Sequence, residues 1–399
     1  MSKINIQDLT KIFGSYPQKG MEDLNNGKSK DEILKETGMT VGVNQASFTV
    51  EEGEIFVVMG LSGSGKSTLI RLLNRLIEPT HGHVFIDDED ISQVTDQRLI
   101  ETRRKKLGMV FQRFGLFPFR TVLANAGYGL EIQGVEKTER EQKAAQAIED
   151  VGLQGYENSY PDQLSGGMQQ RVGLARALAN ETDILLMDEA FSALDPLIRQ
   201  EMQDELLRLQ HKWNKTVVFI THDLDEALKL GDRIAIMKDG RIVQTGTAEQ
   251  ILESPANDYV SRFVEDVDRS KVLTASHIMK NPSVLAVEKD GPRVAVRKME
   301  EAGVSSIFVV DRNRQLKGLL TIDDAIDAYN RDLAMQEILI SDFYSTTPDT
   351  PIQELIASAV DTRYPITVLA EGELLGIVSR VSILSGLVLG KEKEEVTSS

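Results

Sequence analysis

Between about residues 40 and 250, short apolar runs alternate with longer segments in which apolar residues recur at every third or fourth position. The short runs are continuous, which predicts strands buried on both faces, and the longer segments predict helices with one apolar side. The predicted strands are Ile55–Met59, Ile184–Met187, Val217–Ile220 and Ile234–Met237, and the predicted helices are Ser67–Ile77, Thr138–Val151, Gly167–Ala179 and Pro196–Trp213. Thr138 and Glu141 predict a capping box at the start of the second helix. This alternation indicates an α/β domain with a largely parallel sheet.

Residues 15–38 interrupt the pattern with a polar, lysine-containing stretch between two early strand predictions. The stretch predicts two short helices around Gly27, the second opening with a capping box of Ser29 and Glu32. Its simplest interpretation is a small solvated excursion from the fold.

The pattern changes after Val260, where a charged stretch predicts a linker. Beyond the linker, residues 306–326 resemble residues 364–384, and each copy predicts a strand, a turn, a second strand and the start of a helix. Gly318 and Gly376 occupy matching positions in the two copies. An internal repeat of this kind predicts a module built from two similar halves.

These changes of pattern divide the 399 residues into parts, in keeping with roughly 100–200 residues per domain. We expect a first domain over residues 1–265, a linker at 266–271, an α+β module over 272–390 with halves at about 272–330 and 337–390, and a disordered tail at 391–399.

Composition and charge exclude several classes of protein. The chain has no cysteine, which excludes disulfides, thiolate nucleophiles and cysteine-based zinc sites. No apolar run approaches the roughly 20 residues of a membrane helix, and the N-terminus lacks the apolar stretch of a secretory signal, so we expect a cytosolic chain. The net charge of −17 argues against nucleic acid as a partner, because phosphate backbones attract lysine and arginine.

The segment Gly60–Ser67 has the spacing G-x-x-x-x-G-K-S, with a β-rich run before it and a helical pattern after it. Glycines let backbone N–H groups curl around phosphates, and the start of the following helix adds a favourable field. Lys66 is expected to reach the β- and γ-phosphates of a nucleotide, and the Ser67 hydroxyl to ligate Mg²⁺. The expected nucleotide contacts are Gly60, Ser62, Gly63, Ser64, Gly65, Lys66, Ser67 and Thr68.

A second chemical anchor is the apolar run that ends in Asp188 and Glu189. Carboxylates at the C-terminal end of a strand point into the crevice where α/β sheets hold ligands. Asp188 is expected to hold Mg²⁺, directly or through water, and Glu189 to polarise the water that attacks the γ-phosphate. Such a pair in isolation is as often a helix cap, and the phosphate-binding loop is what favours catalysis.

Ser165, Gly166 and Gly167 open a helical pattern between these two motifs, and a helix N-terminus of this kind binds anions. The order of phosphate loop, L-S-G-G segment and Asp-Glu strand resembles the ATP-binding-cassette (ABC) ATPase family. The resemblance implies a P-loop α/β domain with a helical subdomain, and a signature segment that completes the nucleotide site of a partner subunit. Met168 precedes Gln169 here, a variant of the family's L-S-G-G-Q.

The resemblance assigns roles to further residues. It implies that Gln112 contacts Mg²⁺ or the attacking water, that His222 contacts the γ-phosphate, and that Asp195 communicates across a dimer. It also implies that Phe13 stacks on adenine, although the 15–38 stretch follows it. The expected catalytic residues are Glu189, His222, Gln112 and Lys66, and the expected Mg²⁺ ligands are Ser67, Gln112 and Asp188.

The same resemblance implies partners. One phosphate loop and one signature per chain supply half of each composite site, so a homodimer with two ATP molecules is expected. A chain without a membrane span needs integral permease subunits for transport, so we expect it at the inner face of the membrane, attached through them. The apolar segment Phe114–Arg120 is expected either to pack within the helical subdomain or to line the groove that receives a permease helix.

Longer segments resemble the ATPase subunits of osmoregulatory glycine betaine and proline importers. They are MGLSGSGKSTLIRLLNRLIEPT, YPDQLSGGMQQRVGLARALA, ILLMDEAFSALDPLIRQEMQDEL and THDLDEALKLGDRIAIM. The resemblance implies uptake of compatible solutes such as glycine betaine or proline betaine, delivered by an external substrate-binding domain. Carnitine, choline or another small solute is open as cargo, because the ATPase residues do not touch it.

The C-terminal repeat resembles a tandem of cystathionine-β-synthase (CBS) domains, which often bind adenosine nucleotides. Thr321 and Asp324 match a ribose-contacting pattern, whereas the second copy has Ser379, Arg380 and then Ser382 where an acidic residue is expected. Similar bacterial importers bind cyclic di-AMP at such pairs, and Arg380 is expected to bond phosphate. The resemblance therefore implies regulation by cyclic di-AMP or an adenine nucleotide, with a ligand-free dimerisation module as the alternative.

Two basic clusters are candidates for a salt-sensitive contact with anionic lipid, and the alternative for each is a solvated face. They are Arg103–Lys106, and Lys19, Lys28 and Lys30 in the 15–38 stretch. The attraction between such a cluster and anionic lipid weakens strongly with salt, because the Debye length falls from about 10 Å at 0.1 M salt to about 3 Å at 1 M.

Two other functions are open at this point. A soluble ABC ATPase in DNA repair or translation usually carries paired cassettes or coiled-coil insertions, and the acidic charge disfavours a polyanionic partner. A passive nucleotide sensor does not need Glu189 and His222. The leading hypothesis is therefore the ATP-hydrolysing subunit of a binding-protein-dependent importer.

Overall fold

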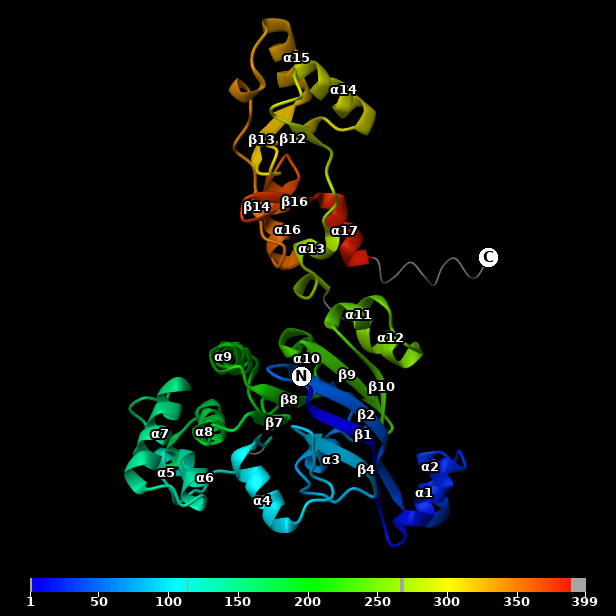
Figure 1. Ribbon diagram of the computed structural model, residues 1–399, viewed down its shortest axis with the longest axis vertical. Helices are drawn as coiled ribbons and strands as arrows, with labels where there is room; N and C mark the ends of the chain where they lie inside the picture. Colours follow the sequence, from blue (N-terminus) through cyan, green and yellow to red (C-terminus); the bar gives the residue numbers. More distant parts are fainter. Residues whose placement is uncertain (1, 113, 266–268, 389–399) are drawn as a thin grey trace. The chain divides into compact units, whose positions relative to one another are not determined.

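The computed structural model describes residues 2–112, 114–265 and 269–388, which form two compact units that divide between Val264 and Glu265 (Figure 1). The predicted tail at 391–399 and residues 266–268 of the predicted linker lie outside the described residues.

The first unit is built around a six-stranded sheet. In spatial order its strands are β10 (Arg241–Gly246), β9 (Arg233–Lys238), β3 (Ile55–Met59), β8 (Thr216–Thr221), β7 (Ile184–Asp188) and β6 (Leu107–Val110). All run parallel except β10, which pairs with β9 in the antiparallel direction. Every residue of β3, β7 and β8 is buried, as parallel strands with both faces covered require. The four strands predicted from continuous apolar runs are confirmed.

A four-stranded antiparallel sheet shares one apolar core with the first sheet. Its strands, in order, are β2 (Thr40–Glu51), β1 (Ser2–Phe13), β4 (His81–Ile86) and β5 (Glu89–Asp90). The rings of Phe48 on β2 and Phe56 on β3 stack with centroids 4.9 Å apart. The helix that follows β3, α3 (Lys66–Leu73), buries three leucines and one isoleucine in this core, which fixes the end of the phosphate loop.

The helices of the first unit fall into two groups. Those around the sheets are α3, α4 (Asp96–Lys105), α9 (Pro196–Trp213), α10 (Leu224–Leu230), α11 (Ala248–Glu253) and α12 (Asp258–Val264). Those that pack on one another as a helical subdomain are α5 (Val122–Ala126), α6 (Tyr128–Ile132), α7 (Lys137–Asp150) and α8 (Gly166–Ala179), with the 3-10 turn η1 (Pro161–Gln163) before α8 (Figure 1). The predicted capping box of Thr138 with Glu141 is wrong, because α7 begins one residue earlier and the Glu136 carboxylate accepts the N–H groups of Thr138 and Glu139.

The 15–38 stretch folds into α1 (Pro17–Asn25) and α2 (Lys30–Thr37). The predicted capping box is confirmed, since the Ser29 hydroxyl accepts the Glu32 N–H at 3.3 Å and the Glu32 carboxylate accepts the Ser29 N–H at 2.7 Å. The two helices pack with β1 and β2 around a small apolar core, so they are a packed part of the unit rather than a solvated excursion. Its residues are Ile12, Met21, Leu24, Ile33, Met39 and Val41.

Two three-stranded sheets form the second unit. They are β11 (Val284–Ala286), β12 (Ser306–Val310) and β13 (Leu316–Thr321), and then β14 (Ser345–Thr346), β15 (Ile366–Ala370) and β16 (Glu373–Val378). The helices are α13 (Ala275–Ile278), α14 (Pro292–Ala302), α15 (Ile322–Arg331), α16 (Ile352–Asp361) and α17 (Arg380–Val388), with 3-10 turns η2 (Arg269–Lys271) and η3 (Met335–Glu337). Gly318 lies opposite Val309 and Gly376 opposite Val368, so the matched glycines hold equivalent places in the two sheets.

The segment that opens the second unit packs on its second half. Leu273, Ala275 and Ile278 contribute to the core formed by α16, β15 and β16, and the Ile352 N–H donates to the Leu273 carbonyl at 2.8 Å. The boundary at 272–330 expected from the repeat groups these residues with the first half. The expected bounds stay a prediction, because packing against the other half does not change which sequence copy a segment belongs to.

The P-loop helix α3 ends at Leu73 rather than at the predicted Ile77. Arg75 has a positive φ of 53° just beyond the helix, and the two carbonyl oxygens of Asn74 and Arg75 accept hydrogen bonds from Arg103 of α4 at 2.9 and 2.7 Å. Arg103 therefore stabilises the end of α3, and burial lowers the pKa of its guanidinium.

The two basic clusters are partly engaged in contacts of this kind. Besides Arg103, Lys106 forms an ion pair with Asp87 at 2.8 Å, Lys28 pairs with Asp23 and Glu36, and Lys30 pairs with Asp239. The exposed members are Lys19, Arg104 and Lys105. A salt-sensitive contact with lipid stays a prediction for both clusters.

Arg103→Ala is expected to lower the free energy of unfolding of the first unit by about 1–2 kcal/mol, because it removes two charge-assisted hydrogen bonds from the end of α3. Urea unfolding of the full chain measures the change. The matched control is Arg104→Ala, an exposed neighbour on α4, which should stay within about 0.5 kcal/mol of the parent. Equal effects of the two substitutions would contradict the role of Arg103.

Candidate functional site

The loop between β3 and α3 is wedged against two other strands. A Cβ atom on Gly60 would lie 2.2 Å from a carbonyl oxygen of β9, and one on Gly65 would lie 2.1 Å from a carbonyl oxygen of β2. The φ angles of these glycines, 156° and 108°, also exclude most side chains. The Gly240 N–H donates to the Ser64 carbonyl at 2.9 Å, which ties the middle of the loop to the β9–β10 turn. The predicted glycine spacing is therefore a steric requirement of this loop.

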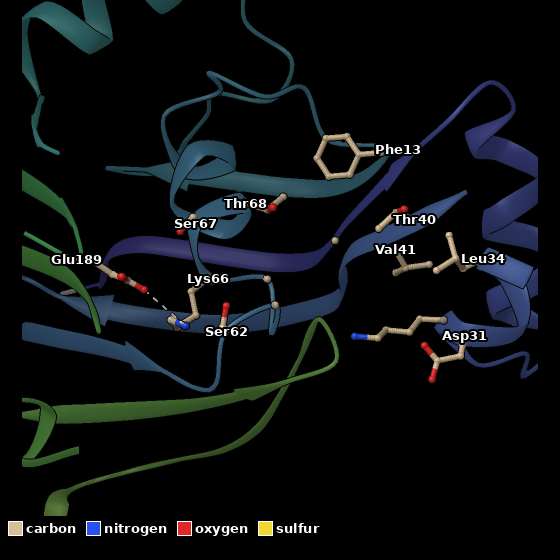
Figure 2. Close-up of a pocket in the computed structure, with 14 residues that line it drawn as sticks. Phe13, Asp31, Leu34, Thr40, Val41, Ser62, Lys66, Ser67, Thr68 and Glu189 are labelled. Carbon is tan, nitrogen blue, oxygen red and sulfur yellow. Dashed lines mark ion pairs between the residues drawn. The ribbon is translucent and has the colours of Figure 1, made fainter. Parts of the chain in front are cut away.

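Lys66 lies across this loop with a side chain that is only 4% exposed. Its ammonium donates to the carbonyl oxygens of Gly60 at 2.7 Å and Leu61 at 3.2 Å. Burial lowers the pKa of the Lys66 amine, and the nearby carboxylate of Glu189, 3.9 Å away, opposes that change. Figure 2 shows Lys66 pointing toward Glu189. A cation held there is available to a phosphate that enters the loop.

Asp188 ends β7 beside the start of α3, where the Ser67 hydroxyl donates to its carboxylate at 3.0 Å. Burial raises the pKa of the Asp188 carboxyl, although the hydrogen bond from Ser67 and the charge of Arg71, 3.7 Å away, lower it. A hydroxyl and a carboxylate at adjacent positions are the hard oxygen ligands that Mg²⁺ prefers. The donor set therefore fits Mg²⁺.

Glu189 has a positive φ of 47°, which is uncommon for a residue with a side chain and marks functional sites. Its N–H donates to the Ile220 carbonyl at 3.0 Å, which ties it to the end of β8. The Gln112 amide donates to its carboxylate at 3.1 Å, and Nδ1 of His222 lies 3.5 Å from the same oxygen. The structure thus brings Lys66, Gln112 and His222, which are far apart in the sequence, around the carboxylate of Glu189.

A cavity of about 540 Å³ opens beside the phosphate loop (Figure 2). It is lined by the predicted residues Phe13, Ser62, Gly63, Gly65, Lys66, Ser67, Thr68 and Glu189, and also by Lys30, Asp31, Leu34, Thr40, Val41 and Gly42. Phe13 is 39% exposed, with the Lys11 ammonium 5.2 Å from its ring centroid. An exposed ring beside a phosphate-binding loop is placed to stack on a base. Gly60 and Ser64 are buried and do not line the cavity.

The signature residues Ser165, Gly166 and Gly167 lie at the N-terminus of α8, and none of them lines this cavity. The Ser165 hydroxyl caps the helix, and the Asp195 carboxylate caps α9 in the same way. Within one chain these four residues are therefore separate from the phosphate loop, so the structure does not assemble all predicted ATP contacts in one place.

Several site residues escaped the sequence prediction. Arg71 faces Asp188 from α3, one helical turn after Ser67, and helix periodicity could have found it. Ser192 accepts a hydrogen bond from the Gln112 amide at 3.2 Å. The α2 residues in the cavity lining have no local motif, because they approach the phosphate loop only in the folded chain.

In the second unit, the predicted ligand-binding residues occupy equivalent helix starts. The Thr321 hydroxyl accepts the Asp324 N–H at 3.2 Å and donates to the Asp324 carboxylate. Ser379 accepts the Ser382 N–H at 3.1 Å, and the two hydroxyls lie 2.9 Å apart. The Arg380 guanidinium donates to three carbonyl oxygens at the end of α16, at 2.7 to 3.0 Å, so it stabilises that helix end.

The wedged phosphate loop, the buried carboxylate at the end of β7 and the helical subdomain together define a P-loop ATPase of the ABC class. Comparison with family models agrees: the ABC transporter model matches residues 43–192, and the CBS domain model matches residues 275–331 and 335–389. One similar solved structure is a dimeric ATP-binding cassette in a post-hydrolysis state, bound to ADP and Pi. It is 33% identical with a TM-score of 0.52, and the match covers 61% of this chain and 98% of the cassette chain.

Curated relatives are similar over nearly the whole length. The glycine betaine/carnitine transport ATP-binding protein of Listeria monocytogenes is 58% identical over 388 residues, 97% of this chain and 98% of the relative. The glycine betaine transport ATP-binding protein of Bacillus subtilis is 56% identical over 98% of this chain and 93% of the relative. The chain belongs to the family of glycine betaine transport ATP-binding proteins of ABC transporters, with C-terminal tandem CBS domains.

Across the residues that the structure describes, no helix is both long and apolar enough to cross a membrane.

Asp188→Asn is expected to raise the melting temperature of the ligand-free chain at pH 8. A carboxyl whose pKa is raised in the folded state is penalised when ionised, so the penalty is absent at low pH and grows as the pH rises above the ordinary value of 3.8. Relief of roughly 1 kcal/mol corresponds to roughly 2–4 °C for a domain of this size. Calorimetry at pH 4, close to the ordinary pKa of 3.8, and at pH 8 should show the larger gain at pH 8. A melting temperature of the variant below that of the parent at pH 8 would contradict the buried-charge penalty.

Proposed function

We propose that this chain is the ATP-hydrolysing subunit of a binding-protein-dependent ABC importer that takes up compatible solutes such as glycine betaine or proline betaine in osmoregulation. The observation that carries the proposal is the convergence of Lys66, Gln112 and His222 on the Glu189 carboxylate, beside the phosphate-binding loop. Three relatives are named for transport of glycine betaine, one of them also for carnitine and another also for proline betaine, which supports the class of cargo.

Each side chain at the site has a proposed role in hydrolysis. Lys66 binds the β- and γ-phosphates, while Ser67, Asp188 and Gln112 hold Mg²⁺, which when bound neutralises charge on the phosphates. Glu189 accepts a proton from the attacking water, with its carboxylate oriented by the Gln112 amide. His222, next to the same carboxylate, contacts the γ-phosphate.

The proposed active form is a homodimer. Ser165, Gly166 and Gly167 of one subunit close the nucleotide site of the other, and Asp195 lies at the junction. This is supported by the position of the α8 N-terminus outside the chain's own cavity and by the dimeric state of the similar solved cassette. The N-termini of α3 and α8 then face the phosphates of one ATP from two sides.

Permease subunits are the proposed membrane partner, with Phe114–Arg120 in the docking groove. The Phe119 side chain is 93% exposed, whereas the Phe117 ring packs on Tyr128 with centroids 4.4 Å apart. The Arg120 guanidinium lies over both rings and pairs with Glu131 at 2.8 Å. An exposed aromatic side chain on a rigid base is typical of interface anchors. Docking there would place the chain at the inner face of the membrane.

Uptake by the reconstituted complex tests this function. ATP inside proteoliposomes is expected to drive entry of labelled glycine betaine, in the presence of the permease and its substrate-binding domain. In the matched variant Glu189→Gln, ATP still binds, but turnover and uptake fall by at least roughly 100-fold because the proton acceptor is lost. Rapid hydrolysis by Glu189→Gln would contradict the role of Glu189, and ATP hydrolysis without any solute uptake by the parent complex would contradict the importer.

We also propose that the CBS pair regulates transport by binding cyclic di-AMP, or alternatively an adenine nucleotide. The helix starts at Thr321 and Ser379 are equivalent, so two similar sites face a ligand with two similar halves. Only the first carries a carboxylate, Asp324, whereas the second carries the Ser382 hydroxyl. A ligand that depends less on ribose contacts than AMP or ATP suits a second helix start that lacks the carboxylate.

Asp324→Asn is expected to weaken binding of AMP to the full chain by about tenfold, because a charged acceptor of a ribose hydroxyl is lost, and to weaken binding of cyclic di-AMP by less. The control is Asp323→Asn, an exposed neighbour on α15, which should bind as the parent does. Titration calorimetry with cyclic di-AMP and with AMP measures both affinities. Absence of binding by the parent chain would leave the dimerisation module as the role of the pair.

A further inference from the structure

The nucleotide cavity has a wall that the phosphate-loop motif does not supply. Residues of α2, in the 15–38 stretch, line the cavity together with Phe13 and Val41. Among them Leu34 is 47% exposed, and Figure 2 shows its side chain projecting from α2 toward the cavity beside Val41. The preceding residue, Ile33, is fully buried in the small core of the stretch, so the backbone that carries Leu34 is fixed.

The start of α2 is also tied to the phosphate loop. Lys30 lines the cavity, and its ammonium forms an ion pair with the Asp239 carboxylate at 2.7 Å. Asp239 lies in the β9–β10 turn, and the N–H of the next residue, Gly240, donates to the Ser64 carbonyl of the loop. Through these two contacts α2 and the phosphate loop hold a defined position relative to each other.

The chemistry of the cavity changes from one end to the other. Gly63, Gly65 and Lys66 supply backbone N–H groups and a cation, which suit phosphates. Phe13 and Leu34 supply exposed apolar surface, beside the polar lining residues of α2 and Thr40. A nucleotide has the same polarity, with charge at the phosphates and flat apolar faces at the base. The base therefore belongs in the part of the cavity that Phe13 and Leu34 line.

We propose that Leu34 of α2 contacts the nucleoside part of ATP, so that Phe13 and Leu34 from different elements jointly bind the base. The inference rests on the proposed function, which places ATP in this cavity, and adds a specificity residue outside the motifs of the ATPase. The apolar wall contributes to affinity for the nucleoside alone, since phosphate groups contact the loop.

Leu34→Ala is expected to weaken Mg–ATP binding by roughly five-fold. This ratio corresponds to the free energy gained when about half of a leucine side chain is removed from water. It should leave binding of Mg–tripolyphosphate unchanged, because that ligand has the phosphates without a nucleoside. Titration calorimetry of the full chain with both ligands measures the two affinities. Leu34→Met, which keeps the apolar bulk, should restore ATP affinity to within about two-fold of the parent.

The matched control is Lys35→Ala, a neighbour on α2 that does not line the cavity, and it should bind both ligands as the parent does. Equal ATP affinity in the parent and in Leu34→Ala would overturn this inference alone. An equal loss for ATP and tripolyphosphate would also overturn it, since the change would then act on the loop. Failure of the parent chain to bind ATP would overturn the proposed function and the inference with it.

Discussion

The close approach of three backbones at the phosphate loop is the constraint on which the rest of the site depends. Gly60 and Gly65 leave no room for a Cβ atom against carbonyl oxygens of β9 and β2, so the loop position follows from the packing of both sheets. The stacked rings of Phe48 and Phe56 lie in the apolar core that joins those sheets. Because α3 starts where the loop ends and buries its apolar side in the same core, the backbone positions of Lys66 and Ser67 are fixed.

Two buried charged groups, Lys66 and Asp188, determine how the stability of the site depends on its ligand. Burial lowers the pKa of Lys66 and raises that of Asp188, so each charged form is less favourable in the empty site than in water. A bound phosphate would add negative charge beside Lys66, and a divalent cation would add positive charge beside Asp188, in addition to the charges of Glu189 and Arg71. The site is therefore less stable without its ligand than a neutral core would be, as is common where residues serve binding rather than packing. The strained φ of Glu189 belongs to the same pattern.

The two units use the same device, a helix start placed at the end of a strand. In the first unit, strand β3 leads into the phosphate loop and α3; in the second, β13 leads to Thr321 and α15, and β16 leads to Ser379 and α17. A helix start of this kind presents N–H groups to an anion. The copies in the second unit differ in the carboxylate of Asp324, which breaks their symmetry at the start of α15, since the second copy has the Ser382 hydroxyl there.

The sequence by itself determined the buried strands, the phosphate loop and the acidic strand end, because these depend on local spacing: continuous apolar runs, glycines that a turn requires, and carboxylates that follow a strand. It also predicted the helices of the 15–38 stretch and the repeat of the second unit, although it misplaced the start of α7 and the end of α3. Only the tertiary structure decided that α2 lines the nucleotide cavity, that Arg103 holds the end of α3, and that Leu273 covers the second half of its unit. The physical reason is that these contacts join residues far apart in the chain, whose approach is set by packing of whole elements and leaves no periodic trace in the local sequence.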